Sequence, residues 1–327
     1  MNRPLVAIVV PVFNGAEHLA ECLESILAQT YPNWRAVVMD NCSTDGTGAI
    51  ADDFARRDSR LRVVHCEKFV GRTENYNRAV AHADDCAEYI KIVEADNWIT
   101  EDSLDRTVGL AAKDIGIGMV SSYSLTGRRV GLDGLAYSEQ VMAGVDVIRL
   151  LYLNSTYLFG APTNLLFRAK ALRDETVCFH ADVCSEDADL CMRVLRKWSF
   201  GFVHQVLAFV RLDDTGAYSK IRDFDHRPAW MYFAIQAYGG DYFNGNELLE
   251  IRRTCERRYF DCLGRAIVTG RSKAYWDFHR GLFRAAGMKL RLRDIFVPAA
   301  RNLIDLALNP KSTIEKLVKP RRRRWRR

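Results

Sequence analysis

Long apolar segments are missing from this sequence. No stretch approaches the roughly 18 uninterrupted apolar residues that a membrane-spanning helix requires. Met1 to Pro4 lead directly into a strand-like segment and lack the pattern of a secretory signal peptide. The nine cysteines contain no CxxC pair and no zinc-ligand spacing, so we expect buried free thiols and neither a metal nor a disulfide framework. These absences predict a cytoplasmic protein.

The body of the chain also lacks a large charge of one sign. The net charge is +6, but Lys319 and the six arginines within 321–327 supply seven positive charges, which leaves −1 elsewhere. A near-neutral body is not typical of a nucleic-acid-binding protein, so we expect no nucleic acid partner. The basic tail, which also contains Trp325, predicts either a solvated chain end or contact with an anionic membrane surface.

The first 125 residues alternate between short apolar runs and helical periodicity, which indicates a parallel sheet covered by helices. Strands are expected at residues 5–10, 35–39, 61–65, 89–93 and 118–122, and later at 163–168 and 200–212. A helix is expected over 185–198, and the chain beyond Tyr218 has an almost wholly helical pattern. The predicted organisation is a domain over 1–220, a helical extension over 221–318 and a tail over 319–327.

Polar residues follow three of the predicted strands. Because the carboxyl ends of parallel strands meet at one edge of a sheet, Asn14, Asp40 and Asp96 are expected to lie close together. Two acidic sites at such an edge can hold a hard divalent cation, which would neutralise a diphosphate. Two structural alternatives remain open: Asp40 can cap a helix, and Asp96 with Asn97 can form an ordinary turn.

Another acidic pair, Glu186 and Asp187, opens the predicted helix over 185–198. The positive end of the helix dipole favours negative charge there and should keep a carboxylate ionised, as a general base requires. Acidic residues are common at helix starts for structural reasons alone, so the pair by itself supports either interpretation.

Five motifs, in this order, resemble those of family 2 glycosyltransferases over roughly residues 4–220. They are the segment Pro11 to Gly15, the turn Asp40 to Thr47, Gly71 through Asn77, Glu94 to Asp96, and Ser185 to Leu190. The resemblance implies an A-type glycosyltransferase fold: an α/β, mostly parallel, Rossmann-like sheet flanked by helices. It further implies a nucleotide-sugar donor at the sheet edge, a divalent cation (Mn²⁺ or Mg²⁺) on its diphosphate, and inversion at the anomeric carbon.

The resemblance also assigns roles residue by residue. Contacts to the donor nucleotide fall on Pro11, Phe13, Asn14, Glu17, Asp40, Arg72, Asn77, Glu94, Ala95 and Asp96. Among these, Asp96 would bind the metal, and Asp40 would accept the imino hydrogen of uracil or thymine, which favours UDP- or dTDP-sugars. Asp187, in the motif that it forms with Glu186, would deprotonate the acceptor hydroxyl, either of a glycan or of a lipid-linked molecule. A role in polysaccharide biosynthesis for the cell envelope, at the inner face of the membrane, follows from the same resemblance.

The sequence departs from the family pattern at several positions. Glu94 stands where aspartate is usual, and Asn41 and Asn97 replace frequent aspartates, which predicts reduced metal affinity. After the last strand the family often has arginine, a spacer and histidine, whereas here Arg211 is followed by Leu212 and Asp213. An aspartate there could ligate a metal ion but would repel a diphosphate.

Two other functions are open on the sequence alone. A sugar-phosphate nucleotidyltransferase also uses a doubly wound sheet and metal-binding acids, but its Gly-rich loop is missing, since Pro11 to Gly15 contains one glycine. A non-catalytic member of the same fold could act as a membrane-surface adaptor, which the departures at Glu94 and Asp213 would suit. Release of nucleoside diphosphate, of pyrophosphate, or of neither distinguishes the three functions.

Overall fold

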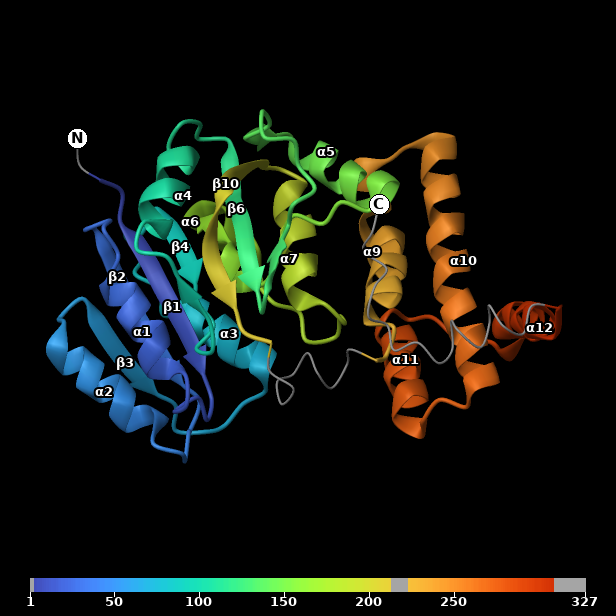
Figure 1. Ribbon diagram of the computed structural model, residues 1–327, viewed down its shortest axis with the longest axis horizontal. Coiled ribbons are helices and arrows are strands. Elements are labelled where there is room, and N and C mark those ends of the chain that lie inside the picture. Colours follow the sequence, from blue (N-terminus) through green and yellow to red (C-terminus); the bar gives the residue numbers. More distant parts are fainter. Residues whose placement is uncertain (1–2, 213–222, 309–327) are drawn as a thin grey trace. The chain divides into compact units, whose positions relative to one another are not determined.

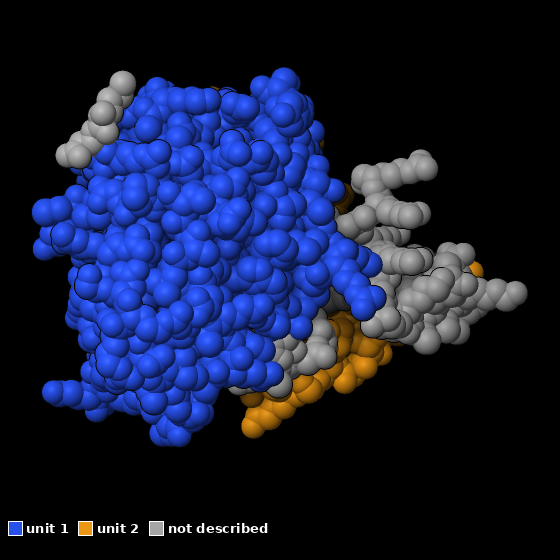
Figure 2. Space-filling view, turned by 60° about the vertical axis from the view of Figure 1, so that its left-hand side comes forward, with its two compact units in different colours: residues 1–181, 186–214 blue, residues 182–185, 215–327 orange. Residues whose placement is uncertain are grey.

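The structure is a computed structural model that describes residues 3–212 and 223–308 (Figure 1). The chain divides into two compact units, residues 1–181 with 186–214 and residues 182–185 with 215–327 (Figure 2). Residue 220 and the segment 319–327, which bound the predicted extension and tail, lie outside the described residues. The proposed domain boundaries therefore remain predictions.

Unit 1 contains a ten-stranded mixed sheet in the order β3-β2-β1-β4-β9-β6-β10-β5, with β7 paired to β6 and β8 paired to β10. Neighbours in β3-β2-β1-β4 are parallel, as are β6 and β10, whereas β9 is antiparallel to both of its neighbours. The strands are β1 (Val6–Val12), β2 (Trp34–Asp40), β3 (Leu61–His65), β4 (Tyr89–Ile92), β5 (Trp98–Ile99), β6 (Ile117–Thr126), β7 (Arg129–Gly131), β8 (Val141–Met142), β9 (Leu166–Arg168) and β10 (Ser199–Val210).

Helices cover both faces of this sheet, which confirms the predicted fold class. The helices of unit 1 are α1 (Leu19–Leu27), α2 (Thr47–Arg57), α3 (Arg72–Ala81), α4 (Ser103–Ala111), α5 (Gly144–Arg149), a π-helical turn (Leu150–Asn154), a 3₁₀ turn (Pro162–Asn164), α6 (Ala169–Arg173) and α7 (Glu186–Leu195). Alternate residues of β1 and β4 share one core with α1, α2 and α4. Ile90, which points to the opposite face of β4, lines a cavity together with α3 and α6.

The sequence patterns explain this arrangement. All seven residues of β1 are buried, as an apolar run covered on both sides requires. The strand predicted over 163–168 is shorter than expected, because Pro162 starts a 3₁₀ turn that includes Thr163 and leaves only Leu166–Arg168 in the sheet. The early strands end side by side, so that the loops after β1, β2 and β4 leave from the same edge.

The secondary-structure elements that the structure describes in unit 2 are all helices: α9 (His226–Tyr242), α10 (Gly245–Thr269), α11 (Lys273–Ala285) and α12 (Leu292–Leu308). Its core is a cluster of aromatic rings from α9, α10 and α11, in which Tyr232 lies 5.2 Å from Tyr259 and Phe233 lies 5.1 Å from Phe283. The buried Tyr259 hydroxyl is 2.7 Å from His279 Nδ1. Burial lowers the pKa of His279 to about 4, so this imidazole is neutral at physiological pH. Among the described helices of both units, none combines the length and the apolarity needed to cross a membrane.

Candidate active site

The loops after β1 and β2 are joined by side-chain hydrogen bonds. The Asn14 amide oxygen accepts the Thr44 N–H at 2.9 Å, and the Asn14 N–H donates to Ser43 Oγ at 2.9 Å. Asp45 Oδ2 accepts the Ala16 N–H at 3.0 Å. Asn14 has a φ of 49°, a left-handed conformation that asparagine tolerates better than most residues. These bonds bring together the first two sequence motifs.

Asp40, at the end of β2, is buried and held from two sides. Its Oδ1 accepts the Ser43 N–H at 3.1 Å, and its Oδ2 lies 3.0 Å from His65 Nδ1. The other ring nitrogen of His65 lies 3.0 Å from Asp52 Oδ1 on α2. Hydrogen bonding to Asp40 and then to Asp52 raises the pKa of His65, because two carboxylates favour the imidazolium. A Cβ at position 48 would lie 3.1 Å from both Asp40 Oδ2 and the His65 ring, so Gly48 leaves the room that this pair needs.

Two exposed phenylalanines follow the strands next to β2, the strand that ends with Asp40. Phe13 follows β1 and Phe69 follows β3, the two strands on either side of β2. Their ring centroids are 4.8 Å apart, and each side chain is about half exposed. Phe69 has no counterpart among the predicted site residues, because a single aromatic in a loop carries no motif. An exposed aromatic pair beside a buried carboxylate is suited to a flat, polar ring such as a nucleobase.

The other residues of the first motif differ in exposure. Pro11 is buried inside β1 and pairs in register with Met39. Glu17 is almost fully exposed, 3.9 Å from His18 Nε2. Burial of Pro11 means that it shapes the start of the loop, whereas the Glu17 carboxylate remains accessible to a ligand.

Glu94, directly after β4 and Val93, is held by three side chains. Its Oε1 accepts the Tyr76 hydroxyl at 2.9 Å, and its Oε2 accepts the Asn97 amide at 3.0 Å and the Thr163 hydroxyl at 3.3 Å. Burial, followed by the charge of Asp96, raises the pKa of Glu94 to about 7. Both carboxylate oxygens thus have partners from α3, the 94–97 turn and the 3₁₀ turn.

The turn that contains Asp96 is tied to the end of β10. Arg211 donates through Nε to the Asp96 carbonyl oxygen at 3.2 Å, and its backbone N–H donates to Asn97 Oδ1 at 2.9 Å. Its guanidinium also pairs with Glu21 at 2.5 Å and lies over the Trp98 ring. Asn97, which replaces a frequent aspartate, thereby connects Glu94 to β10. Asp213, the other residue of the predicted late-loop departure, lies outside the described residues.

The acidic pair at the start of α7 belongs to the same region. Glu186 forms an ion pair with Arg72 at the start of α3. The Asp187 carboxylate accepts the N–H of Ala188 at 2.8 Å, and its charge contributes to the raised pKa of Glu94. Asp96 and Asp187 are therefore each within electrostatic range of Glu94, although Asp187 is far from the other two in the sequence. Ala95 is buried between the first two.

Asn77 holds the loop that leads into α7. Its amide donates to the Phe179 carbonyl at 2.8 Å and accepts the Phe179 N–H at 2.9 Å. A buried ion-pair network fixes the same loop: Arg193 contacts Asp189 at 2.9 Å and also pairs with Glu175. The Asn77 side-chain nitrogen and oxygen each already bind a backbone group of Phe179. A contact with the nucleotide would have to form in addition to these two hydrogen bonds, at the same nitrogen or oxygen. That contact stays a prediction.

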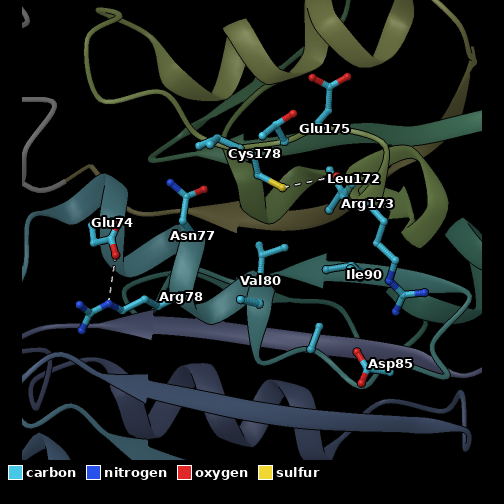
Figure 3. Close-up of a pocket in the computed structure, with 14 residues that line it drawn as sticks. Glu74, Asn77, Arg78, Val80, Asp85, Ile90, Leu172, Arg173, Glu175 and Cys178 are labelled. Atoms are coloured by element: carbon cyan, nitrogen blue, oxygen red, sulfur yellow. Dashed lines mark hydrogen bonds and ion pairs between the residues drawn. The ribbon is translucent and has the colours of Figure 1, made fainter.

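A cavity of about 570 Å³ lies behind α3, between this helix and residues 172–178 (Figure 3). Val80 and Ile90 lie at its apolar centre, and Cys178 points toward it. Asn77 is its one lining residue in common with the predicted site; Asp40, Glu94, Asp96 and Asp187 do not line it. We therefore place the candidate site at the strand ends and not in this cavity.

In the described segments, no three His, Cys, Asp or Glu side chains group closely enough to hold a metal ion by themselves. A metal ion at this edge would therefore need ligands from a bound donor in addition to a protein carboxylate, and the assignment of that carboxylate to Asp96 stays a prediction. Mg²⁺ and Mn²⁺ sites that use one protein carboxylate plus substrate phosphates have this composition.

The chain is similar to known glycosyltransferases. Among curated relatives, "Glycosyltransferase GlyG" of Streptococcus pneumoniae is 39% identical over 101 residues, which cover 31% of this chain and 33% of that protein. "Putative teichuronic acid biosynthesis glycosyltransferase TuaG" of Bacillus subtilis is 30% identical over 104 residues, which cover 32% of this chain and 40% of that protein. The matched segments thus span well under half of either relative.

Solved structures share the fold at low identity. The S. aureus TarS 1–349 complex with UDP-GlcNAc matches with a TM-score of 0.61 and 18% identity, covering 86% of this chain and 79% of that one. The mannosyltransferase PcManGT from Pyrobaculum calidifontis, in complex with GDP-Man and Mn²⁺, matches with a TM-score of 0.57 and 19% identity, covering 97% and 84%. The family model of glycosyl transferase family 2 matches residues 7–176, more than half of the 327 residues. The chain therefore belongs to glycosyl transferase family 2.

Proposed function

We propose that this protein transfers a sugar from a nucleoside-diphosphate donor to an acceptor hydroxyl, with inversion at the anomeric carbon. The observation that carries the proposal is the approach of Glu94, Asp96 and Asp187, which belong to two separate family motifs, at the edge where Asp40 also ends its strand. Membership of glycosyl transferase family 2 supports the same reaction class.

The donor base would bind at the ends of β1, β2 and β3. Phe13 and Phe69 offer ring faces for stacking, and Asp40 offers a carboxylate that accepts but does not donate hydrogen bonds. Such an acceptor matches the imino N–H of uracil or thymine, so UDP- and dTDP-sugars are the preferred donors. The part of the site that binds the base would also include Pro11, Asn14 and Glu17. The part that binds the diphosphate would include Arg72, Asn77, Glu94 and Ala95.

Asp96 would hold the divalent cation, Mn²⁺ or Mg²⁺, on the donor diphosphate. When bound, such a cation offsets the negative charge that the departing nucleoside diphosphate acquires. Glu94, hydrogen-bonded to Tyr76, Asn97 and Thr163, would set the position of the Asp96 turn. A single-carboxylate site agrees with the lowered metal affinity expected from the departures in this motif.

Asp187 would act as the general base. It lies in the first turn of α7, and a carboxylate is a group that can take the acceptor proton. Glu186 is paired with Arg72, which lowers its availability for the same task. As the acceptor oxygen attacks the anomeric carbon, its proton passes to Asp187 and the bond to the diphosphate breaks, so no covalent sugar intermediate is required.

The acceptor would be a glycan or a lipid-linked precursor in polysaccharide synthesis for the cell envelope. The name of the relative TuaG, which refers to teichuronic acid biosynthesis, supports this class of acceptor. A cytoplasmic protein with peripheral contact at the inner face of the membrane suits it, and the basic tail over 319–327, outside the described residues, would contribute to that contact.

Thermal-shift screening against nucleotide sugars, with and without Mn²⁺ or Mg²⁺, tests the donor assignment, because a ligand of the folded state raises the melting temperature. The best donor is then incubated with candidate acceptors, and the released product is identified. Nucleoside diphosphate release supports the proposal. Pyrophosphate release would indicate the nucleotidyltransferase alternative, and binding with no turnover for any acceptor would favour the non-catalytic adaptor.

A further inference from the structure

Helix α12 packs one face closely against α10. Ile295, Pro298 and Ala299 are on this buried side of the helix. A Cβ at position 264 of α10 would lie 2.7 Å from the backbone of both Pro298 and Ala299, so Gly264 permits this close approach. The orientation of α12 about its axis within unit 2 is therefore fixed by tight packing.

The opposite side of α12 is apolar and exposed. Five large side chains are between 52% and 74% exposed: Phe296, Val297, Leu303, Ile304 and Leu308. At about 100° per residue, these five fall within a sector of roughly 140° and form one continuous stripe along the helix. We call this set the α12 stripe. A contiguous group of exposed apolar side chains usually marks a surface that binds a membrane or another molecule.

Positive charge accompanies the α12 stripe. The exposed Arg293 falls within the same sector and Arg301 borders it; they lie 3.6 Å from Asp294 and 3.4 Å from Asp261, respectively. In the sequence, residues 288–308 contain four lysines and arginines against two acidic residues, a net charge of +2, and residues 309–327 add +8, whereas residues 1–287 carry −4. The excess of positive charge in the sequence therefore begins with α12 and increases in the residues that follow it.

We propose that the α12 stripe inserts into the surface of an anionic phospholipid bilayer, with α12 parallel to the membrane plane. Apolar side chains on one side of a helix, next to basic residues, are the composition of interfacial helices, and firm anchoring generally takes two such signals. A second copy of the chain is a poorer occupant of this face, because a symmetric pair would bring together two helices of the same net charge, +2 each over residues 288–308, whereas an anionic bilayer supplies the opposite charge. This interface extends the membrane contact proposed for the tail to a folded helix, and it does not depend on the chemistry of the active site.

Vesicle co-sedimentation tests the interface. The full chain is mixed with vesicles of phosphatidylcholine alone or with 30% phosphatidylglycerol, at low and high salt. The triple variant Phe296→Gln, Leu303→Gln and Ile304→Gln removes most of the stripe while it keeps residues with good helix propensity. The matched control, Leu249→Gln with Ile267→Gln, alters two exposed apolar residues of α10 in the same unit. A truncation that lacks residues 319–327 separates the stripe from the tail.

We expect the wild type and the α10 control to bind the anionic vesicles equally and the triple variant to bind at least about tenfold more weakly. The truncated chain should lose the salt-sensitive part of binding and retain a salt-resistant part, because screening acts on charges and not on apolar contacts. If the triple variant binds as well as the wild type, the stripe is not the interface. If the stripe instead mediates self-association, the wild type should be a dimer, the triple variant should be a monomer, and neither should bind vesicles. This result would also overturn the proposal.

Folding of the variant is checked by its melting temperature and by circular dichroism. Should the triple variant unfold, the single change Ile304→Glu places a charge in the middle of the stripe at a residue that is 59% exposed. Weaker vesicle binding by this single variant supports the interface, and unchanged binding contradicts it. The vesicle-binding results do not depend on whether the protein is active toward any donor. Failure of the proposed function and failure of this inference are therefore distinguishable.

Discussion

His65 should control the affinity of the protein for the donor base through Asp40. In the variant His65→Leu, Asp40 Oδ2 loses its 3.0 Å partner and keeps only the Ser43 N–H, which binds the other oxygen. A hydrogen bond to a charged group contributes about 1.5–3 kcal/mol. Because the His65 side chain is 48% exposed, solvent screening reduces this to about 1 kcal/mol, or roughly fivefold in Kd.

The effect should also depend on pH, with a defined sign. The folded protein raises the pKa of His65 above its ordinary value of 6.5. The contribution of the imidazolium is therefore fully present below pH 6.5 and is lost as the pH rises through the raised pKa. A neutral ring has one N–H and cannot donate to both Asp40 and Asp52. The other ionisable groups nearby are the Cys42 and Cys66 thiols and the Arg78 guanidinium beside Cys66.

Calorimetric titration with uridine diphosphate and with inorganic pyrophosphate, between pH 5.5 and 8.5, measures the effect. Binding of the nucleotide should weaken in His65→Leu, whereas pyrophosphate binding should not change. Because Glu94, with a pKa raised to about 7, and the phosphates titrate in the same range for both ligands, the pyrophosphate profile is subtracted, and the remaining pH dependence of nucleotide binding should disappear in His65→Leu. His65→Gln retains one amide donor, so we expect partial recovery without this remaining pH dependence. Equal weakening for both ligands, or a remaining pH dependence that is the same in His65→Leu as in the wild type, would refute the positioning role.

Four further substitutions test other residues. Asp96→Ala should abolish the dependence of nucleoside diphosphate binding on Mn²⁺ in calorimetry, and an unchanged dependence would remove Asp96 from the metal site. Asp187→Asn should lower kcat at saturating donor by about 100-fold or more with donor affinity preserved; near-normal turnover would point to another base, first Glu186. Asp40→Ala should weaken uridine or thymidine nucleotides more than free diphosphate, and equal losses would indicate a structural cap. Burial lowers the pKa of Lys91 to about 7, so the unfolded chain binds more protons between pH 7 and 10.5. Lys91→Met should thus raise stability by a few kcal/mol at pH 7 and by little near pH 10.5, as chemical denaturation at the two pH values would show.

The sequence was most informative where apolar runs were continuous. Strands β1, β2, β3 and β4 lie within two residues of their predicted bounds. For β1, β2 and β4 the reason is burial on both faces, which requires a short and nearly uninterrupted apolar segment, whereas β3 is only partly buried. The two-residue strands β5 and β8 were not predicted. Each exists through its pairing with β10, a partner far along the chain, and leaves no periodic pattern of its own.

The candidate site was harder to predict, because its residues are held by side chains from segments that are distant in the sequence. The motif that contains Glu94 and Asp96 presents two carboxylates two residues apart, and spacing alone gives them similar roles. Their environments differ because Tyr76 from α3 and Thr163 from the 3₁₀ turn both donate to Glu94. His65 was likewise expected only as the last residue of a strand, yet it connects Asp40 to Asp52.

The partners of Glu94 also explain why a longer acid can stand where aspartate is usual. Val93 ends the buried run of β4, so a carboxylate at position 94 must reach the Tyr76 hydroxyl on one side and Thr163 with Asn97 on the other. The additional methylene of glutamate supplies that reach, and the amide of Asn97 donates a hydrogen that aspartate, ionised, would not have. An aspartate at position 97 would instead place a second negative charge next to the Glu94 carboxylate and close to Asp96. The two departures from the family pattern are therefore coupled: the glutamate at 94 and the asparagine at 97 form one hydrogen-bonded unit, in which each residue type accounts for the other.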